Sequence, residues 1–183
     1  GLNILFAGNI GVAQSFDTII EAAQIIKQHM IKFRFVIIGE GRDKSRVLKK
    51  IENYSLNDNF KFLGSYPAKQ MSNFFAAADA LLVSLKDTKI FSMTIPGKLQ
   101  SYLACGRPII GSLNGIGAEI INKSKSGFVS ASEDSKSLAS SIIKFNNLES
   151  KDREVLGNNA RKYFEKEFSR DKLLDELIDI FKK

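Results

Sequence analysis

The feature that most constrains the fold is a regular alternation of short apolar runs with helical segments. The runs are apolar along most of their length, as expected of strands that are covered on both faces. Strands that alternate with helices favour βαβ units with right-handed crossovers, and therefore a parallel sheet. About six strands are predicted, at Leu2–Ala7, Phe33–Ile38, Phe60–Leu63, Ala80–Ser84, Ile109–Gly111 and Gly127–Val129.

Apolar residues at helical spacing predict helices between and after these strands. The first helix has Ser15 or Asp17 as its N-cap and ends near His29. The others are predicted at Arg42–Asn53, Ala68–Ala78, Lys98–Cys105, Ala118–Asn122, Ser135–Phe145, Asp152–Phe164 and Arg170–Phe181. The pattern predicts a Rossmann-like, three-layer αβα fold with a helical C-terminal extension. Because no linker or repeat interrupts it, we assign residues 1–183 to a single domain.

The size and composition of the chain fit one domain with a substantial core, since it has 183 residues of which 44% are hydrophobic. No apolar run approaches the roughly 20 residues of a membrane-spanning helix, and no secretory signal is visible. The single cysteine, Cys105, excludes an internal disulfide. These features predict a cytoplasmic protein. Because the chain opens directly into a strand without a Met, we expect a fragment whose upstream part is missing.

The net charge of +7 favours anionic partners such as nucleotides, phospholipid surfaces or nucleic acid, although a Lys-rich solvated surface would give the same value. Nucleic acid is the least favoured partner. It would require aromatic residues interleaved with basic ones on an exposed sheet face, whereas most Phe residues here occupy predicted core positions. The basic residues are scattered rather than clustered as in segments that bind anionic lipids. The charge therefore permits peripheral contact with the inner face of the cell membrane without indicating it.

Glycines gather at the carboxyl ends of the predicted strands, which is where open parallel sheets bind ligands. They occur in the segments Gly8–Gly11, Gly39–Arg42, Gly64–Tyr66 and Gly111–Ser112. Glycine lets a backbone approach a ligand closely or adopt a positive φ. The first of these loops is neither a GxGxxG fingerprint nor a phosphate loop with Gly-Lys-Ser/Thr. This argues against an NAD-dependent dehydrogenase and against a Walker-type NTPase.

The stretch Phe91–Ser112 is the strongest candidate for a binding element. Pro96 and Gly97 break the chain before the helix predicted at Lys98–Cys105, and Gly106-Arg107-Pro108 ends that helix. A helix N-terminus at the edge of the sheet offers unpaired backbone N–H groups to a phosphate or sugar. Lys98 lies at this N-terminus, so it is the best candidate for a cation that contacts a phosphate.

Several motifs in this chain resemble the C-terminal half of a family 4 glycosyltransferase of the GT-B fold. They are GNIG after the first strand, FVIIGEGR, FKFLGSYP, AADALLVSL, PGKLQSYLACGRPIIGS and SGFVSASED. The resemblance covers essentially the whole chain, and its most specific parts are KLQSYLACGRPII and the FVIIGEG and FLG segments. Within the family, the chain most resembles bacterial enzymes that build O-antigen, capsule or colanic-acid-type polysaccharides with amino sugars.

The resemblance implies the donor-binding half of a two-domain enzyme whose acceptor-binding N-terminal half is absent here. Such enzymes transfer a hexosyl or N-acetylhexosaminyl group from a nucleotide sugar, which we expect to be a UDP-sugar, to a glycan or lipid-linked acceptor. They usually retain anomeric configuration and use neither a metal nor another cofactor, because helix N-termini and basic side chains stabilise the leaving diphosphate. Alone, this domain is expected to bind nucleotide and to transfer little.

The chain departs from the family pattern at the charged positions of the site. The two family glutamates fall on Met93 and Ser101, and the basic residues of the first loop fall near Asn9 and Gln14. Lys98 is the best substitute cation for stabilising the leaving diphosphate. Ser101 could hydrogen-bond a ribose hydroxyl, but more weakly than a carboxylate would. The other basic candidates are Arg42, Lys86 and Lys89.

The predicted nucleotide-sugar site joins the strand-end loops to the N-terminus of this helix. Its residues are Asn9, Gly11, Gly39, Gly41, Arg42, Ser65, Tyr66, Lys98 and Ser101. The alternative is a GT-B-like nucleotide-sugar epimerase or another sugar-nucleotide-binding domain that performs no transfer. A phosphorylase would need a lysine for pyridoxal phosphate, and no lysine is singled out for that role. The sequence leaves the choice between UDP and GDP open, as well as the sugar, the acceptor and the linkage.

Overall fold

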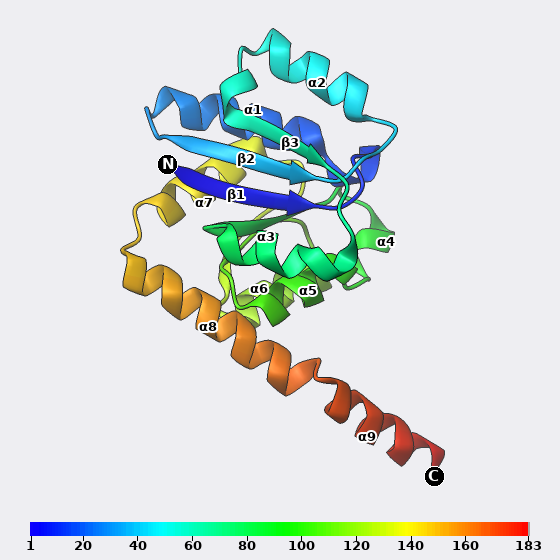
Figure 1. Cartoon of the computed structure of the whole chain (residues 1–183). Helices are drawn as coiled ribbons and strands as arrows, with labels where there is room; N and C mark the ends of the chain where they lie inside the picture. The colour runs from blue at the N-terminus through cyan, green and yellow to red at the C-terminus, as the bar shows by residue number, and fades with distance from the viewer. Residues whose placement is uncertain (183) are drawn as a thin grey trace.

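The sheet has six parallel strands in the order β3-β2-β1-β4-β5-β6, with helices on both faces (Figure 1). The computed structural model describes residues 1–182, except for the side chains of residues 171, 175 and 176. The strands are β1 (Leu2–Ala7), β2 (Phe33–Ile38), β3 (Phe60–Gly64), β4 (Ala80–Ser84), β5 (Ile109–Ser112) and β6 (Gly127–Ser130). The predicted parallel sheet and its strands are therefore confirmed, with β3, β5 and β6 each one residue longer than expected.

The strand order reverses between β1 and β4. From β1 the chain builds outward to β3 and then returns to the centre of the sheet to form β4. The register of β1 and β4 covers only Ile4 with Ala80 and Leu5 with Leu81, so the two strands separate toward their carboxyl ends. In open α/β sheets a crevice outside the carboxyl ends of the strands forms at such a switch point.

Two helical layers enclose the sheet, as predicted. One face carries α1 (Phe16–Gln28), α2 (Lys44–Asn53) and α7 (Ser135–Asn146). The other carries α3 (Met71–Ala77), α5 (Gly97–Cys105), α6 (Ile116–Ser124) and α8 (Ser150–Glu167). Alternation along β1 shows how one strand serves both layers, since Ile4 and Phe6 pack with the first layer and Leu5 packs with the second. The core is thus two apolar clusters separated by the sheet.

Two local features differ from expectation. Ser15 is the N-cap residue of α1, as predicted, but its backbone is left-handed (φ 46°) and its side chain makes no capping hydrogen bond. Its Oγ lies 2.9 Å from Thr18 Oγ1 instead. The segment after β4, for which no helix was predicted, contains a short helix, α4 (Lys89–Ser92), which Thr88 caps by accepting a hydrogen bond from the backbone N–H of Phe91.

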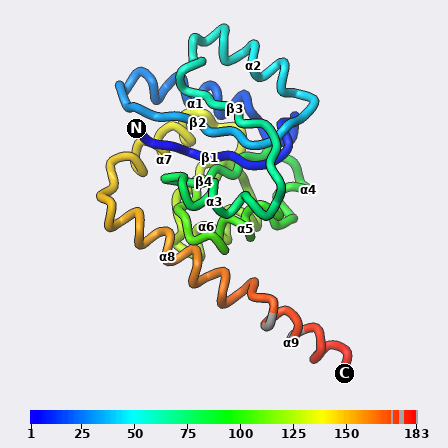
Figure 2. The backbone as a smooth tube through the Cα atoms, viewed as in Figure 1, coloured from blue at the N-terminus to red at the C-terminus, as the bar shows by residue number. Residues whose placement is uncertain are grey.

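The C-terminal helices extend away from the sheet (Figure 1; Figure 2). Helix α8 begins beside the sheet, and α9 (Arg170–Phe181) continues beyond it. This is the predicted helical C-terminal extension. The described apolar side chains of α9 are largely exposed, from 44% for Leu174 to 81% for Phe181. No helix in the described part of the chain is long and apolar enough to cross a membrane.

Candidate functional site

A cavity of about 460 Å³ opens at the carboxyl edge of the sheet, beside the switch point. Its walls come from the loops after β1, β2 and β3, from α3 and from the first turns of α5. The lining residues are Ala7, Gly8, Asn9, Ile38, Gly39, Glu40, Ser65, Tyr66, Ala68, Met71, Phe75, Lys98, Ser101 and Tyr102. The segments that sequence analysis placed at one edge of the sheet therefore meet around one space.

The loops after β1 and β2 are joined by a short ladder of backbone hydrogen bonds. Gly8 N–H donates to the Ile38 carbonyl at 2.9 Å, and Ile10 N–H donates to the Glu40 carbonyl at 2.9 Å. Asp43 N–H donates to the Ile10 carbonyl at 3.1 Å. Each strand end is thus held by its neighbour, and the floor of the cavity is rigid before any ligand arrives.

Two glycines permit this close contact between the loops. A Cβ added at Gly39 would lie 1.9 Å from the Gly8 carbonyl oxygen, and one added at Gly41 would lie 2.0 Å from the carbonyl oxygen of Ile10. The sequence explained these glycines by close approach of the backbone to a ligand or by a positive φ, and Gly39 has a φ of +140°. The structure gives both a further use, since their missing side chains make room for the neighbouring loop.

Tyr66 lines the cavity on the β3 side, and Phe74 packs against its ring. The ring centroids of Tyr66 and Phe74 lie 4.5 Å apart, and Tyr66 is 40% exposed. Gly64, which precedes this loop, has φ of +76°, a conformation that favours glycine. Tyr66 therefore presents a partly exposed ring at the cavity wall, where a planar base could pack against it.

Helix α5 supplies the opposite wall. Lys98, Ser101 and Tyr102 line the cavity from one side of this helix, because residues three and four positions apart share a helical face. Tyr102 is fully buried, and its Oη accepts a hydrogen bond from the Ala7 N–H at 2.9 Å. Burial raises the pKa of Tyr102. The phenol oxygen thus accepts the hydrogen bond of a β1 backbone N–H at the point where β1 no longer pairs with β4.

Lys98 is the electrostatic centre of the cavity. Its Nζ lies 3.8 Å from the centroid of the Phe6 ring and is closed off from solvent. Within the described residues it has no hydrogen-bond partner. The position that a Cβ would occupy at Gly8 is 2.9 Å from this nitrogen. Burial lowers the pKa of Lys98 to about 8. A buried ammonium without a counter-ion is costly, and an anion bound in the cavity would relieve that cost.

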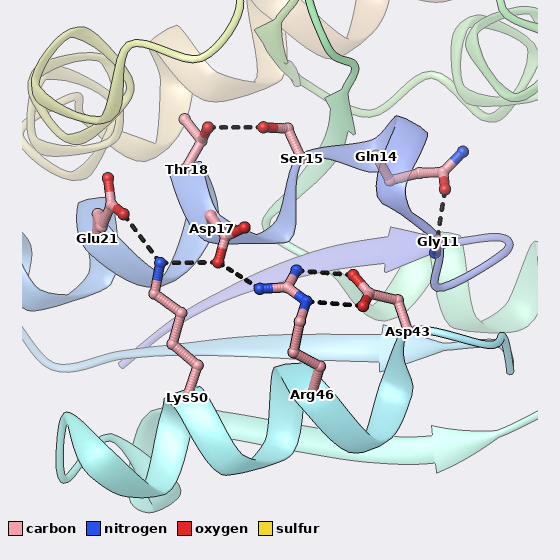
Figure 3. Close-up of polar contacts among 9 residues, drawn as sticks. All are labelled: Gly11, Gln14, Ser15, Asp17, Thr18, Glu21, Asp43, Arg46 and Lys50. Carbon is pink, nitrogen blue, oxygen red and sulfur yellow. Dashed lines mark hydrogen bonds and ion pairs between the residues drawn. The ribbon is translucent and has the colours of Figure 1, made fainter.

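A charged network on the outer face of α1 and α2 contrasts with this site (Figure 3). Arg46 contacts Asp17 at 2.8 Å and donates two hydrogen bonds of 2.7 Å to Asp43. Lys50 contacts Asp17 at 2.7 Å and Glu21 at 2.9 Å. The Arg46 guanidinium lowers the pKa of Asp17 and of Asp43. The network ties α1 to α2 just behind the joined loops.

The structure brings most, but not all, of the predicted residues to the cavity. Those that line it are Asn9, Gly39, Ser65, Tyr66, Lys98 and Ser101. Gly11 and Arg42 line a neighbouring hollow that also contacts Asn9, and Gly41 packs against the loop after β1. Met93, at the position of a family glutamate, is 63% exposed and does not line the cavity.

Eight lining residues were missing from the predicted set, among them the polar or loop residues Gly8, Glu40 and Tyr102. Gly8 and Glu40 lie in the strand-end segments that had been singled out, so strand-end position was a sufficient signal for them. Tyr102 could have been found from its spacing, because it follows Lys98 by four residues on the same helix.

The strand order and the crevice define the class of protein. Sheets with this order, in which a ligand site lies at the switch point, are Rossmann-like nucleotide-binding domains. Comparison of the sequence with protein families is more specific. The chain belongs to the family described as Glycosyl transferases group 1, which it matches over residues 2–163.

Bacterial polysaccharide glycosyltransferases are among the relatives of this chain. It is 26% identical over 180 residues to the putative colanic acid biosynthesis glycosyltransferase WcaL of Escherichia coli, covering 98% of this chain and 44% of that protein. It is 28% identical over 144 residues to the amylovoran biosynthesis glycosyltransferase AmsK of Erwinia amylovora, covering 78% of this chain and 35% of that protein. The resemblance to bacterial polysaccharide glycosyltransferases is confirmed, whereas the assignment to family 4 stays a prediction. The chain spans less than half the length of these relatives.

Solved GT-B glycosyltransferase structures share the fold. The crystal structure of Anabaena Alr3699/HepE in complex with UDP matches with a TM-score of 0.85 and 14% identity, over 100% of this chain and 49% of that chain. The C-terminal domain of the group 1 glycosyl transferase LpcC from Francisella tularensis matches with a TM-score of 0.75 and 20% identity, over 92% of this chain and 87% of that one. The predicted fold class is therefore confirmed.

Proposed function

We propose that this chain is the donor-binding half of a retaining glycosyltransferase that uses a UDP-sugar in the synthesis of a cell-envelope polysaccharide. The observation that carries the proposal is the unpaired, buried Lys98 ammonium beside a preformed cavity at the switch point. A cation in that position has a use when an anionic ligand is bound. A nucleoside diphosphate sugar supplies that anion.

The proposed binding mode follows the order of groups along the cavity. The base packs near Ser65 and the ring of Tyr66, and the diphosphate lies beside Gly8 and Asn9 on the Lys98 side. Sugar transfer leaves negative charge on the departing diphosphate, and Lys98 stabilises that charge. This mechanism uses neither a metal nor another cofactor. Gly11, Gly41 and Arg42 contribute by shaping the loop and the neighbouring hollow.

The relatives support the choice of pathway and donor. WcaL and AmsK are named for colanic acid and amylovoran biosynthesis, and the Anabaena structure that shares this fold was solved with UDP. We propose that a glycan or lipid-linked acceptor is bound by a further, N-terminal half, since the relatives are more than twice as long as the matched region. Work at the inner face of the cell membrane, with a hexosyl or N-acetylhexosaminyl donor, is part of the same proposal.

An amide NMR titration of this chain without added metal tests the donor site. We expect UDP and UDP-N-acetylglucosamine to shift the amides of residues 8–14, 39–42, 64–66 and 98–101, and GDP-mannose and NAD to leave them unchanged. A selective response to GDP-mannose would overturn the choice of UDP. If no nucleotide shifts any of these amides, the domain does not bind a donor by itself and the assignment of the cavity is wrong.

A further inference from the structure

Glu40 is the acidic residue that lines the cavity among the described residues, and the proposed donor-binding mode leaves it without a role. It follows β2 directly, between the glycines that lock the two loops together. Its backbone carbonyl accepts the hydrogen bond from Ile10, which fixes the position of the residue. A fixed carboxylate in a site for an anionic ligand requires an explanation, because it repels phosphate.

The order of the strands supplies one. The ends of β3, β2 and β1 lie side by side along the edge of the sheet (Figure 1), and neighbouring strands are about 4.8 Å apart. The base is assigned to the loop after β3 and the diphosphate to the loop after β1. The middle of a nucleotide laid across these strands therefore lies over the end of β2, next to Glu40. The ribose is the uncharged middle part of the ligand.

The exposure and the remaining acceptor sites of the Glu40 carboxylate fit a partner with two hydroxyl groups. Lys44 Nζ lies 2.8 and 3.0 Å from the two Glu40 oxygens and holds the side chain from the α2 side. Glu40 remains about half exposed, at 53% of its side chain. A carboxylate has about four acceptor sites, so each oxygen can still accept a hydrogen bond. Ser101, at the family's second glutamate position, offers only a hydroxyl from the opposite wall.

We propose that Glu40 binds the ribose of the donor nucleotide by accepting hydrogen bonds from its 2′- and 3′-hydroxyls, and thereby makes the site selective for ribonucleotides. This inference rests on the proposed function of the cavity. It assigns recognition of the ribose to the loop after β2, because α5 offers the Ser101 hydroxyl and no carboxylate to the cavity. Lys44 acts as a positioning residue, because it touches Glu40 and does not line the cavity.

Calorimetric titration of UDP and 2′-deoxy-UDP into the wild-type chain and a Glu40→Gln variant tests this assignment. The wild type should bind UDP about tenfold more tightly than 2′-deoxy-UDP, because a hydrogen bond to a charged group is lost. In Glu40→Gln that ratio should fall to about two, with most of the loss on UDP. A merely structural role for Glu40 would weaken both ligands equally and leave the ratio unchanged.

Glu52→Gln, the same change at an exposed position of α2 outside the cavity, is the matched control. It should keep the wild-type preference for UDP. Thermal unfolding of each variant verifies that it is folded. If wild type shows no preference, or if Glu40→Gln keeps the wild-type ratio while UDP still binds, the ribose assignment is overturned and the donor site stands. If UDP does not bind the wild type, both fail.

Discussion

Two charged regions of this domain are built in opposite ways. On the outer face of α1 and α2, the five charged residues of Figure 3 contact one another directly. At the inner end of α5, Lys98 lies against an aromatic ring and has no partner within the described residues. The network is exposed to solvent, where ion pairs contribute little each, and the unpaired charge is buried, where it costs most.

This difference separates charges that serve the fold from a charge that serves a ligand. The network ties α2 to α1 through the contacts of Arg46 and Lys50 with Asp17. For Lys98, burial disfavours the charged form and lowers its pKa, in spite of the contact with the Phe6 ring. Substitutions in the two regions should therefore have opposite effects on stability and on binding, and five predictions test that separation.

The largest effect should follow Lys98→Met. We expect UDP to bind roughly 10- to 100-fold more weakly, because a charge-assisted hydrogen bond to the ligand is lost. The free energy of unfolding should stay equal or rise. Methionine keeps the packing on Phe6 and removes the unpaired charge. Calorimetry and urea unfolding measure the two quantities. Lys162→Met, an exposed change on α8, is the control. A marked loss of stability in Lys98→Met would show that the ammonium serves the fold after all.

Gly41→Ala tests the contact between the loops after β1 and β2, next to the charged network, without removing a charge. The new Cβ would lie 2.0 Å from the Ile10 carbonyl oxygen, so the joined loops must move apart. We expect a loss of about 1–3 kcal/mol in the free energy of unfolding, as for other overpacked sites. Gly97→Ala is the matched control, because nothing lies within 4 Å of its added Cβ. Equal stability of both variants would contradict the tight loop contact.

The pH dependence of binding should isolate Lys98. Its pKa of about 8 in the free domain should rise when an anion binds beside it. Binding therefore favours the protonated form, and affinity for UDP-N-acetylglucosamine should fall about tenfold between pH 7 and pH 9. Calorimetry across this range tests it, with Lys98→Met as the reference. A pH slope that persists in this variant would assign the titration to another group.

Stability should change with pH in the opposite direction. Between about pH 8 and the ordinary lysine pKa of 10.5, the unfolded chain binds more protons at this residue than the folded one. The Lys98 contribution to stability therefore increases as pH rises through that window. The difference in free energy of unfolding between wild type and Lys98→Met isolates it from other titrating groups. A difference that stays constant from pH 7 to pH 10 would contradict a depressed pKa.

The smallest effect should follow Arg46→Met. Because the side chains of Arg46 and Asp17 are about half exposed, we expect a loss of about 1 kcal/mol of stability that diminishes at high salt. UDP affinity should stay within about twofold of wild type, since the charge lies outside the cavity. Lys49→Met, on the exposed side of the same helix, gives the reference. A large loss of UDP affinity would mean that the network also holds the binding loops.

The sequence was sufficient for the sheet and for the strand-end loops that meet at the cavity, but not for the α3 residues that line it. Apolar strand runs and strand-end glycines are local patterns, and the loops at the carboxyl edge meet because the strands are parallel. The purpose of Gly39 and Gly41 could not be predicted, because both contacts are with a loop about thirty residues away in the sequence. The burial of Lys98 against Phe6 likewise depends on the separation of β1 from β4, which appears only in three dimensions.

The reversal of strand order has a consequence for how the chain folds. Strands β1 to β3 and β4 to β6 are each built from sequential neighbours, whereas β1 and β4 pair across more than seventy residues of chain. The entropic cost of closing a loop of that length precedes the favourable energy of the β1–β4 contact. The two halves of the sheet should therefore form as separate cooperative units and join late along β1 and β4. The ligand cavity lies beside the contact between β1 and β4. A bound nucleotide would therefore stabilise the part of the domain that assembles last.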